Sequence, residues 1–163
     1  MPMCDIPQPE VIAVADDLRL RAFDGEFRFA FDWYQDVETV WLVDGVKVPY
    51  TMEKLERMYR YLDKQGELYF IEVLEDDHWK PIGDVAFWQG DMPIVIGDAA
   101  YRGRGIGKQV IGTLIQRGRE LGFKRLCVNE IYTYNAASRA CFASMGFREY
   151  EKTEDGSSFQ LEL

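Results

Sequence analysis

The chain carries the stretch Tyr101-Arg102-Gly103-Arg104-Gly105-Ile106-Gly107-Lys108, which stands between a short β-branched run and a long apolar periodic segment. The run is Ile94-Val95-Ile96, and the periodic segment extends from Ile106 to Leu121. A strand, a glycine-rich turn and the start of a helix form an anion-binding arrangement, because the first amides of a helix lack intrahelical partners and the helix dipole favours negative charge there. Glycines also remove the Cβ atoms that would keep a phosphate away from the backbone. The stretch therefore predicts a ligand that bears phosphate.

Two common phosphate loops do not fit the spacing of these glycines. A Walker A loop requires G-x-x-x-x-G-K followed by Ser or Thr, whereas Gly103 to Gly107 is one residue too short and Gln109 stands at the hydroxyl position. A dinucleotide fingerprint requires G-x-G-x-x-G early in a βαβ unit, whereas the spacing here is G-x-G-x-G and Lys108 occupies the last glycine position. An ATP-dependent phosphotransferase and a Rossmann domain are therefore disfavoured.

Two blocks of the chain carry a resemblance to a known family. Arg102-Gly103-Arg104-Gly105-Ile106-Gly107 matches the [RQ]-x-x-G-x-[GA] signature of the GNAT superfamily of acyl-CoA-dependent N-acetyltransferases. Residues 135–147, NAASRACFASMGF, are similar to the family's N-x-x-[AS]…[YF]-x-x-x-G-F helix and the strand that follows it. The blocks stand in the family's order, with the strand-like Arg125 to Ile131 between them. The resemblance covers residues 68–163 well and the N-terminal third only loosely.

The resemblance implies a mixed α/β (α+β) fold. Its twisted, mostly antiparallel sheet is flanked by helices, and its fourth and fifth strands splay apart to admit the acyl-CoA. The hydrophobic pattern predicts elements in an order that agrees with this fold, while residues 37–49 show no clear pattern. The expected elements are a strand at Leu18–Phe23, an aromatic helical segment from Asp24 to roughly Tyr34, a helix at Met52–Asp63 capped by Thr51, strands at Glu67–Leu74, Ile82–Trp88 and Ile94–Ile96, a helix at Ile106–Leu121, a strand from Arg125 toward Tyr132, a helix at Asn135–Met145, and a hairpin of Phe147–Lys152 with Ser158–Leu163.

Composition bounds the class of protein. The 163 residues are 47% hydrophobic and 14% aromatic, so we expect one globular domain, an N-acetyltransferase domain over residues 1–163. No apolar run approaches the length of a membrane span, and the N-terminal residues do not follow a signal-peptide pattern. Cys4, Cys127 and Cys141 are odd in number and lack C-x-x-C spacing, which favours reduced thiols and a cytoplasmic protein. With His78 as the single histidine, a His-rich metal site is excluded, and we expect no metal and no membrane partner.

Charge is distributed unevenly along the chain. The net charge of −9 argues against nonspecific nucleic-acid binding. Residues 101–125 nevertheless hold seven basic residues and one acidic residue, a balance of +6, which leaves 12 basic and 27 acidic residues, or −15, in the rest of the chain. An acidic protein with one basic segment at a glycine loop suits a polyanionic cofactor.

The resemblance implies acetyl-CoA as the co-substrate and assigns its contacts. The backbone of Ile94 to Ile96 would bond the pantetheine arm as a further strand would, with one N–H facing the thioester oxygen. The amides from Arg104 to Lys108 would bind the pyrophosphate, and nearby basic side chains would add charge. The expected cofactor-binding residues are Ile94, Val95, Ile96, Arg102, Gly103, Arg104, Gly105, Ile106, Gly107, Lys108, Asn135, Ser138 and Phe142.

Transfer to an amine also needs a base, because a primary amine has a pKa of about 10.4 and is mostly protonated at neutral pH. Glu130, near the splayed end of its strand, is the first candidate, Asp98 is the second, and a water chain to a distant carboxylate stays open. Many family members place a tyrosine, which protonates the departing thiolate, at the position of Phe142. Tyr132 or Tyr134 could replace it.

We therefore expect an enzyme that moves acetyl from acetyl-CoA to an amine by direct attack in a ternary complex. The acceptor stays open between a small molecule, such as an aminoglycoside or a polyamine, and a protein N-terminal amine. The alternative is a non-catalytic acyl-CoA-binding or sensor module, which is favoured by the phenylalanine at position 142 and by the lack of a motif that marks the base. A homodimer is an open option for the assembly.

Overall fold

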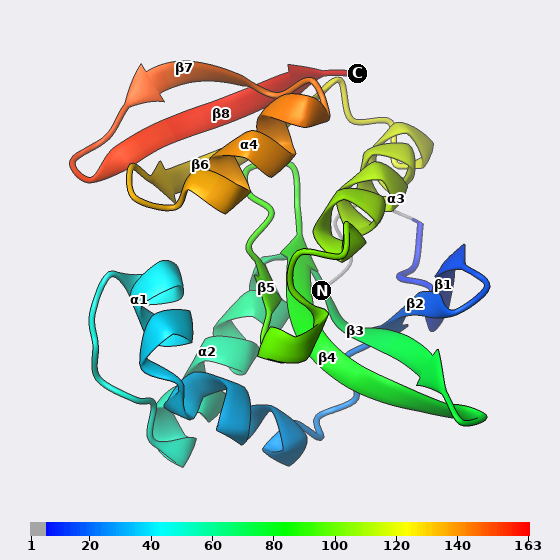
Figure 1. Cartoon of the computed structure of the whole chain (residues 1–163). Helices are drawn as coiled ribbons and strands as arrows, with labels where there is room; N and C mark the ends of the chain where they lie inside the picture. Colours follow the sequence, from blue (N-terminus) through cyan, green and yellow to red (C-terminus); the bar gives the residue numbers. More distant parts are fainter. Residues whose placement is uncertain (1–5) are drawn as a thin grey trace.

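Two antiparallel sheets lie side by side in the structure, a computed structural model that describes residues 6–163 (Figure 1). The first sheet has the strand order β1-β2-β3-β4-β5, and the second has the order β6-β8-β7. The strands are β1 (Val11–Ala15), β2 (Leu18–Ala22), β3 (Glu67–Glu75), β4 (His78–Phe87), β5 (Ile94–Ile96), β6 (Arg125–Tyr132), β7 (Arg148–Lys152) and β8 (Gly156–Glu162). The helices are the 3-10 helices η1 (Arg28–Gln35) and η2 (Ala99–Tyr101) and the α-helices α1 (Val37–Asp44), α2 (Met52–Gln65), α3 (Ile106–Glu120) and α4 (Ala136–Ser144).

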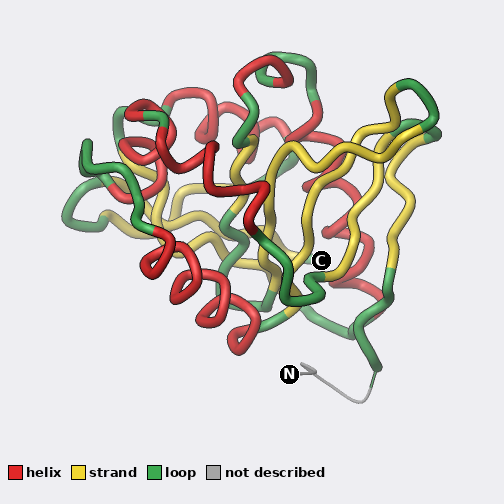
Figure 2. The backbone as a smooth tube through the Cα atoms, turned by 90° about the horizontal axis from the view of Figure 1, so that it is seen from below, coloured by secondary structure: helices red, strands yellow, loops and turns green. Residues whose placement is uncertain are grey.

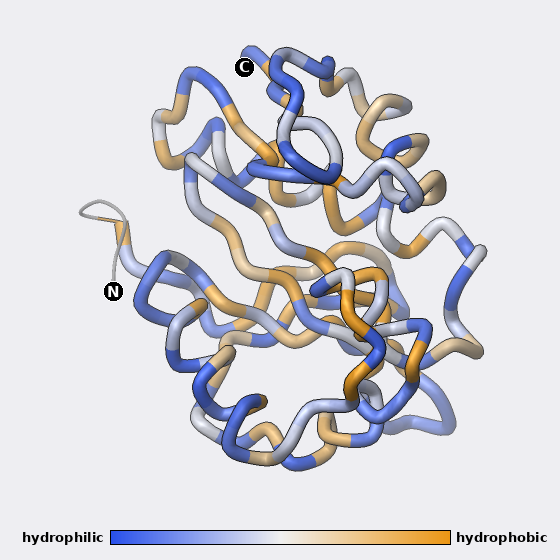
Figure 3. Tube along the Cα trace, turned by 90° about the vertical axis from the view of Figure 1, so that its left-hand side faces the viewer, coloured by the Kyte–Doolittle hydropathy of each residue, from blue (hydrophilic) through white to orange (hydrophobic). Residues whose placement is uncertain are grey.

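Helices cover both faces of the first sheet, because its side chains alternate between two apolar cores (Figure 2). Tyr69 and Ile71 of β3 face α3 and the second sheet, whereas Leu68 and Phe70 of the same strand face η1, α1 and α2. Hydrophobic segments accordingly gather in the interior of the trace, with hydrophilic segments mainly outside (Figure 3). This layering confirms the predicted mixed α/β class.

The two sheets meet at one end and separate at the other. Cys127 of β6 donates its N–H to the carbonyl of Gln89 at 3.0 Å, and Asn129 donates its N–H to the carboxylate of Asp91 at 3.0 Å. Beyond these bonds β5 pairs only with β4, and β6 pairs only with β8. The predicted splay of the fourth and fifth strands is therefore confirmed. The predicted fourth and fifth strands are labelled β5 and β6 in the structure, because the structure contains one additional strand, β1, before them.

The N-terminal third differs most from the prediction. β1 pairs with β2 across a turn at Asp16 and Asp17, although its sequence VIAVA has no polar alternation to mark it as a strand. The unclear residues 37–49 contain α1, whose start is marked by Asp36, which caps the N–H of Thr39. The apolar residues of α1 surround the helix, so they give no single apolar stripe.

The hairpin of β3 and β4 has a tighter turn than the expected Glu75–Pro81 connection. Asp76 and Asp77 form it with φ values of 51° and 64°, and β4 already begins at His78. Pro81 stands at the irregularity where the register shifts, a position at which a strand tolerates a residue without an N–H.

A buried carboxylate lies next to β5, on the face of the first sheet that packs against η1, α1 and α2. Asp84, on β4 opposite Val95, is 2% exposed and accepts hydrogen bonds from the hydroxyls of Tyr34 (2.7 Å) and Tyr59 (2.8 Å). Burial raises the pKa of Asp84 to about 6, although the two hydroxyls oppose the rise. The folded state therefore keeps a proton on Asp84 at pH values where the unfolded chain has lost it.

This proton makes stability depend on pH. Between the unfolded pKa of 3.8 and the folded pKa of about 6, stability falls as pH rises, since the folded state binds the additional proton. A shift of about two units corresponds to about 3 kcal/mol. We expect Asp84→Asn to lose this dependence, so that its free energy of unfolding improves relative to wild type by about 3 kcal/mol between about pH 4 and pH 7. Urea unfolding of both proteins at a series of pH values measures the difference, and a difference that stays constant with pH contradicts the expectation.

Candidate active site

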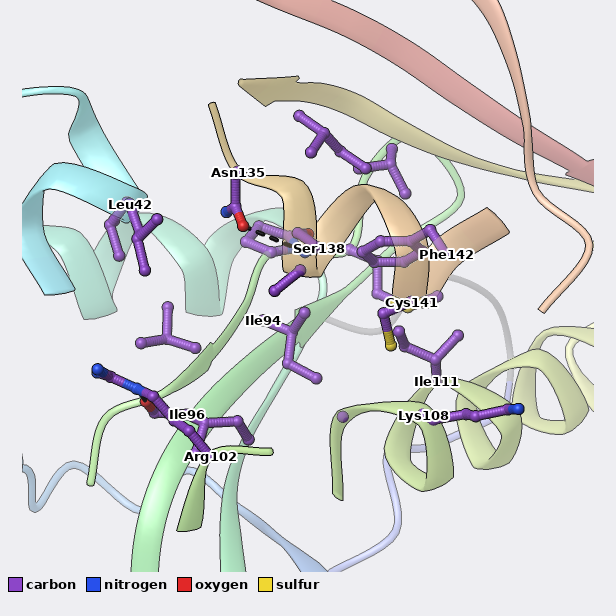
Figure 4. A pocket seen from close by; sticks show the side chains of 18 of the residues that line it. Leu42, Ile94, Ile96, Arg102, Lys108, Ile111, Asn135, Ser138, Cys141 and Phe142 are labelled. Carbon is purple, nitrogen blue, oxygen red and sulfur yellow. Dashed lines mark hydrogen bonds between the residues drawn. The ribbon is translucent and has the colours of Figure 1, made fainter. Parts of the chain in front are cut away.

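A cavity of 620 Å³ opens where β5 and β6 separate (Figure 4). It is bounded by α1, the segment from Asp91 to Ile96, the glycine loop, β6 and α4. Of the residues predicted for the site, the cavity is lined by Ile94, Val95, Ile96, Arg102, Gly103, Gly105, Ile106, Gly107, Lys108, Glu130, Tyr132, Asn135, Ser138 and Phe142. Arg104 and Asp98 do not line it.

One end of the cavity is the start of α3, and its amides are free. Within residues 6–163, side chains cap α1, α2 and α4 through Asp36, Thr51 and Asn135. By contrast, α3 begins at Gly105 with no side-chain cap and no acidic residue in its first turn. Gly103 and Gly105 have φ values of 73° and 77°, the left-handed region that favours glycine. We call the amides of residues 106–108 the anion end, since unpaired N–H groups at a helix N-terminus attract negative charge.

The three basic side chains predicted for this end lie in different surroundings. Lys108 lines the cavity and is exposed. The guanidinium of Arg104 lies 4.9 Å over the ring of Tyr101, outside the cavity lining. Arg102 extends toward α1, on the other side of the cavity from Lys108 (Figure 4). Arg102 also lines the cavity, and its guanidinium hydrogen-bonds to Thr39 of α1.

The free edge of β5 forms one wall of the cavity. β5 is the last strand of its sheet, so its N–H and C=O groups on the cavity side have no strand partner. The opposite edge of β5 pairs with β4 and approaches it closely at Gly83. A Cβ atom on Gly83 would lie only 2.2 Å from the carbonyl oxygen of Val95. An extended ligand with amide groups can bond to such an edge as a further strand does.

Helix α4 forms the facing wall of the cavity. Asn135 caps it by accepting the N–H of Ser138 at 3.1 Å. Cys141 faces the cavity (Figure 4), and burial raises the pKa of its thiol, so the thiol is protonated at neutral pH. Phe142 is 2% exposed and packs edge-on against Phe147 at 5.1 Å between ring centroids. Both side chains are packing residues of the cavity wall.

Glu130 and Tyr132 of β6 define the other end of the cavity. The carboxylate of Glu130 accepts hydrogen bonds from the hydroxyl of Thr153 and from the N–H of Asp155, the latter at 3.4 Å. Burial and then the negative charge of Glu130 raise the pKa of Tyr132, so its hydroxyl stays protonated at neutral pH. We call Glu130 and Tyr132, together with Thr39, Leu42 and Val43 of α1, the acceptor end.

The other two predicted side chains are committed elsewhere. Asp98 lies 3.3 Å from the ammonium of Lys80 and accepts the N–H of Ala100 at 3.0 Å, so it serves the turn at η2. Tyr134 donates its hydroxyl to the carbonyl of Trp41 at 2.6 Å and stacks on the Trp41 ring at 4.5 Å. Neither side chain lines the cavity.

Helix α1 and Asp91 are among the contributors to the cavity that were not predicted from the sequence. Thr39, Leu42 and Val43 of α1 line it, and the cap at Asp36 was the available signal for that helix. Asp91 lines the cavity and accepts the N–H of Met92 at 2.9 Å as well as that of Asn129. Burial raises the pKa of Asp91.

Residues 6–163 contain neither a membrane-spanning helix nor a metal-binding cluster. No helix among residues 6–163 is long and apolar enough to cross a bilayer. In the same range, no three side chains of His, Cys, Asp or Glu gather in a way that could hold a metal ion.

Comparison with known proteins assigns the family. Residues 27–147 match the model of the acetyltransferase (GNAT) family. The chain belongs to the GNAT acetyltransferase family. No curated protein sequence matches the chain.

Solved GNAT structures share its fold at low sequence identity. The GNAT-family acetyltransferase from Bacillus anthracis has a TM-score of 0.75 and 12% identity over 91% of this chain and 96% of its own. RimL, the ribosomal L7/L12 alpha-N-protein acetyltransferase in complex with coenzyme A, has a TM-score of 0.74 and 19% identity over 94% and 98%. The aminoglycoside acetyltransferase AAC(6')-Ib in complex with coenzyme A has a TM-score of 0.72 and 14% identity over 89% and 94%.

Proposed function

We propose that this member of the GNAT family is an acyl-CoA-dependent N-acetyltransferase whose acceptor is a cationic amine. The observation that carries the proposal is one cavity with two chemically different ends. Uncapped amides of α3 form the first end, and Glu130 is among the residues that line the second, with the free edge of β5 between them.

The anion end supports acetyl-CoA as the co-substrate. The amides of Ile106, Gly107 and Lys108 would hold the diphosphate, with Lys108 adding a charge. The free edge of β5 would hold the amide-bearing pantetheine arm, and Asn135 and Ser138 stand on the facing wall. When bound, acetyl-CoA supplies an acetyl group activated as a thioester. Two structural neighbours were solved with coenzyme A, which agrees with this proposal.

Charge at the acceptor end supports a cationic acceptor. After burial, the carboxylates of Glu130, Asp44 and Asp155 are the causes that raise the pKa of Tyr132, which places their combined field at this side chain. Asp44, which does not itself line the cavity, already binds an ammonium group of the protein beside an aromatic ring. The Nζ of Lys54 lies 4.3 Å over the ring of Tyr50 and 3.3 Å from Asp44. Carboxylates beside aromatic faces attract cations.

Glu130 and Tyr132 supply the proton chemistry in this proposal. Glu130 takes the proton that the ammonium form of the acceptor must lose, either directly or through water. The hydroxyl of Tyr132, kept protonated by its surroundings, is the donor that replaces the tyrosine absent at Phe142. Thr153 and the N–H of Asp155 fix the Glu130 carboxylate in place.

Release of the CoA thiol from acetyl-CoA tests the proposal. The acceptors are spermidine, kanamycin and a peptide with a free N-terminal amine, each paired with its N-acetylated or neutral analogue. We expect thiol release only with an amine, and faster release with spermidine or kanamycin than with a neutral amine such as glycinamide at a pH where the latter is uncharged. Equal rates of thiol release with the charged and the neutral amines would contradict the proposal that the acceptor is cationic.

The sensor alternative makes the opposite prediction in the same assay. Phe142, in place of the usual tyrosine, is the observation that favours it. CoA binding measured by calorimetry, combined with no thiol release on any amine, would replace the enzyme with a non-catalytic acyl-CoA-binding module.

A further inference from the structure

Arg102, the first residue of the glycine motif, connects the two ends of the cavity. Its Nε donates to the carbonyl of Ile96, the last residue of β5, at 2.9 Å. A terminal nitrogen of the same guanidinium donates to the hydroxyl oxygen of Thr39 in α1 at 2.6 Å. The other terminal nitrogen lies 3.9 Å from the carboxylates of both Asp36 and Glu38. One side chain therefore joins the cofactor-side strand to the first turn of the acceptor-side helix.

Thr39 is built to receive this bond. It is 1% exposed, and its own hydroxyl proton is donated to Asp36 at 2.9 Å. Its N–H also goes to Asp36, at 3.1 Å. The oxygen of Thr39 can therefore act toward Arg102 only as an acceptor, and loss of Arg102 leaves this buried oxygen without its donor.

The location of these bonds makes them a link between binding events. Arg102 directly precedes the glycines of the loop that leads to the anion end. A ligand that restricts the motion of this loop therefore also restricts the motion of Arg102. Thr39, Leu42 and Val43 line the acceptor end, so the position of α1 shapes the acceptor's pocket. Two sites joined through one rigid connection influence each other's affinity, and the influence is reciprocal.

We propose that Arg102 is a positioning residue that couples occupation of the anion end by CoA to the placement of α1 at the acceptor end. The proposal rests on the proposed function, which gives the two ends their ligands. It differs from a direct role in phosphate binding, in which Arg102 would turn to the diphosphate and Thr39 would have no part.

Amide hydrogen exchange with and without CoA tests the coupling independently of turnover. In the wild type we expect CoA to slow exchange both at residues 106–110 and in α1, residues 37–44. The slowing in α1 should be about fivefold or more, the lower end of usual coupling between sites. In Arg102→Met and in Thr39→Val the slowing in α1 should disappear while that at residues 106–110 persists. The double variant should behave like either single one, because both remove the same bond.

Matched variants separate coupling from structure. Thr39→Ser keeps the hydroxyl and should keep the response of α1, whereas Thr39→Val, of similar size, should lose it. Arg119→Met removes an exposed arginine from α3 and should leave the response unchanged. Lys108→Met should weaken CoA binding about tenfold or more, as loss of a charge-assisted contact does, and Arg102→Met should weaken it far less.

Each other outcome overturns a specific statement. If Arg102→Met weakens CoA binding as much as Lys108→Met does and Thr39→Val has no effect, Arg102 is a phosphate ligand and the coupling is wrong. If CoA binds the wild type but exchange in α1 does not change, the two ends are independent. If CoA does not bind the wild type at all, the proposed function fails together with the coupling.

Discussion

Replacing Gly105 with aspartate should raise the Kd for CoA by about 100-fold or more. Gly105 is the N-cap of α3, and a carboxylate there lies at the helix N-terminus that we assign to the diphosphate. It would repel the ligand and compete for the same amides. Loss of two hydrogen bonds to a charged group, at about 1.5 kcal/mol each, already gives this factor. Isothermal titration with CoA measures it.

Gly105→Asn is the matched control for this variant. Asparagine has the shape of aspartate, accepts positive φ values better than most residues, and carries no charge. A Cβ at Gly105 meets no atom within 4 Å, so the fold has room for either side chain. The Asn variant should therefore lose much less affinity than the Asp variant. Equal affinities for the Asp variant and the wild type, with both folded, would contradict the assignment of the anion end.

Replacing Glu130 with glutamine should lower kcat by about 100-fold or more while leaving the affinity for CoA nearly unchanged. General base catalysis usually contributes about 10²- to 10⁴-fold, and glutamine cannot take the proton of the amine. The amide oxygen of glutamine can still accept from Thr153 and from the N–H of Asp155, so the hairpin of β7 and β8 keeps its contacts. Steady-state turnover with the best acceptor of the thiol-release assay measures the loss.

Thr153→Val separates the chemistry of Glu130 from its support. This variant removes one hydrogen bond to the carboxylate but keeps the carboxylate itself, so it should cost much less activity than Glu130→Gln. If Glu130→Gln keeps kcat within about threefold of wild type, less than any usual general base contributes, Glu130 is not the base. Asp91, the other carboxylate that lines the cavity, then becomes the candidate to test.

The residues proposed for the cofactor half of the site lie in one local stretch of sequence, whereas those of the acceptor half do not. In the proposed function, residues 94–108 would act through backbone groups of consecutive elements, so strand, glycine loop and helix could be recognised in one window. The motif at residues 135–147 likewise describes a single helix with its cap. The local conformation of these segments can therefore be predicted from their own residues.

The acceptor half depends on contacts between distant segments. The bond of Arg102 to Thr39 could not be predicted from local sequence, because Thr39 stands 63 residues earlier in a helix without a single apolar stripe. The ion pair of Asp98 could not be predicted from local sequence either, because its partner Lys80 lies in β4. Such partners follow from tertiary packing, which no local pattern encodes.

An amide NMR titration with CoA tests the central claim most directly. The claim is that the unpaired amides at the start of α3 receive the diphosphate of CoA. We expect the largest shifts at the N–H signals of Ile106, Gly107 and Lys108, with smaller changes along β5. Binding of CoA that leaves these three signals in place and shifts others instead would contradict it.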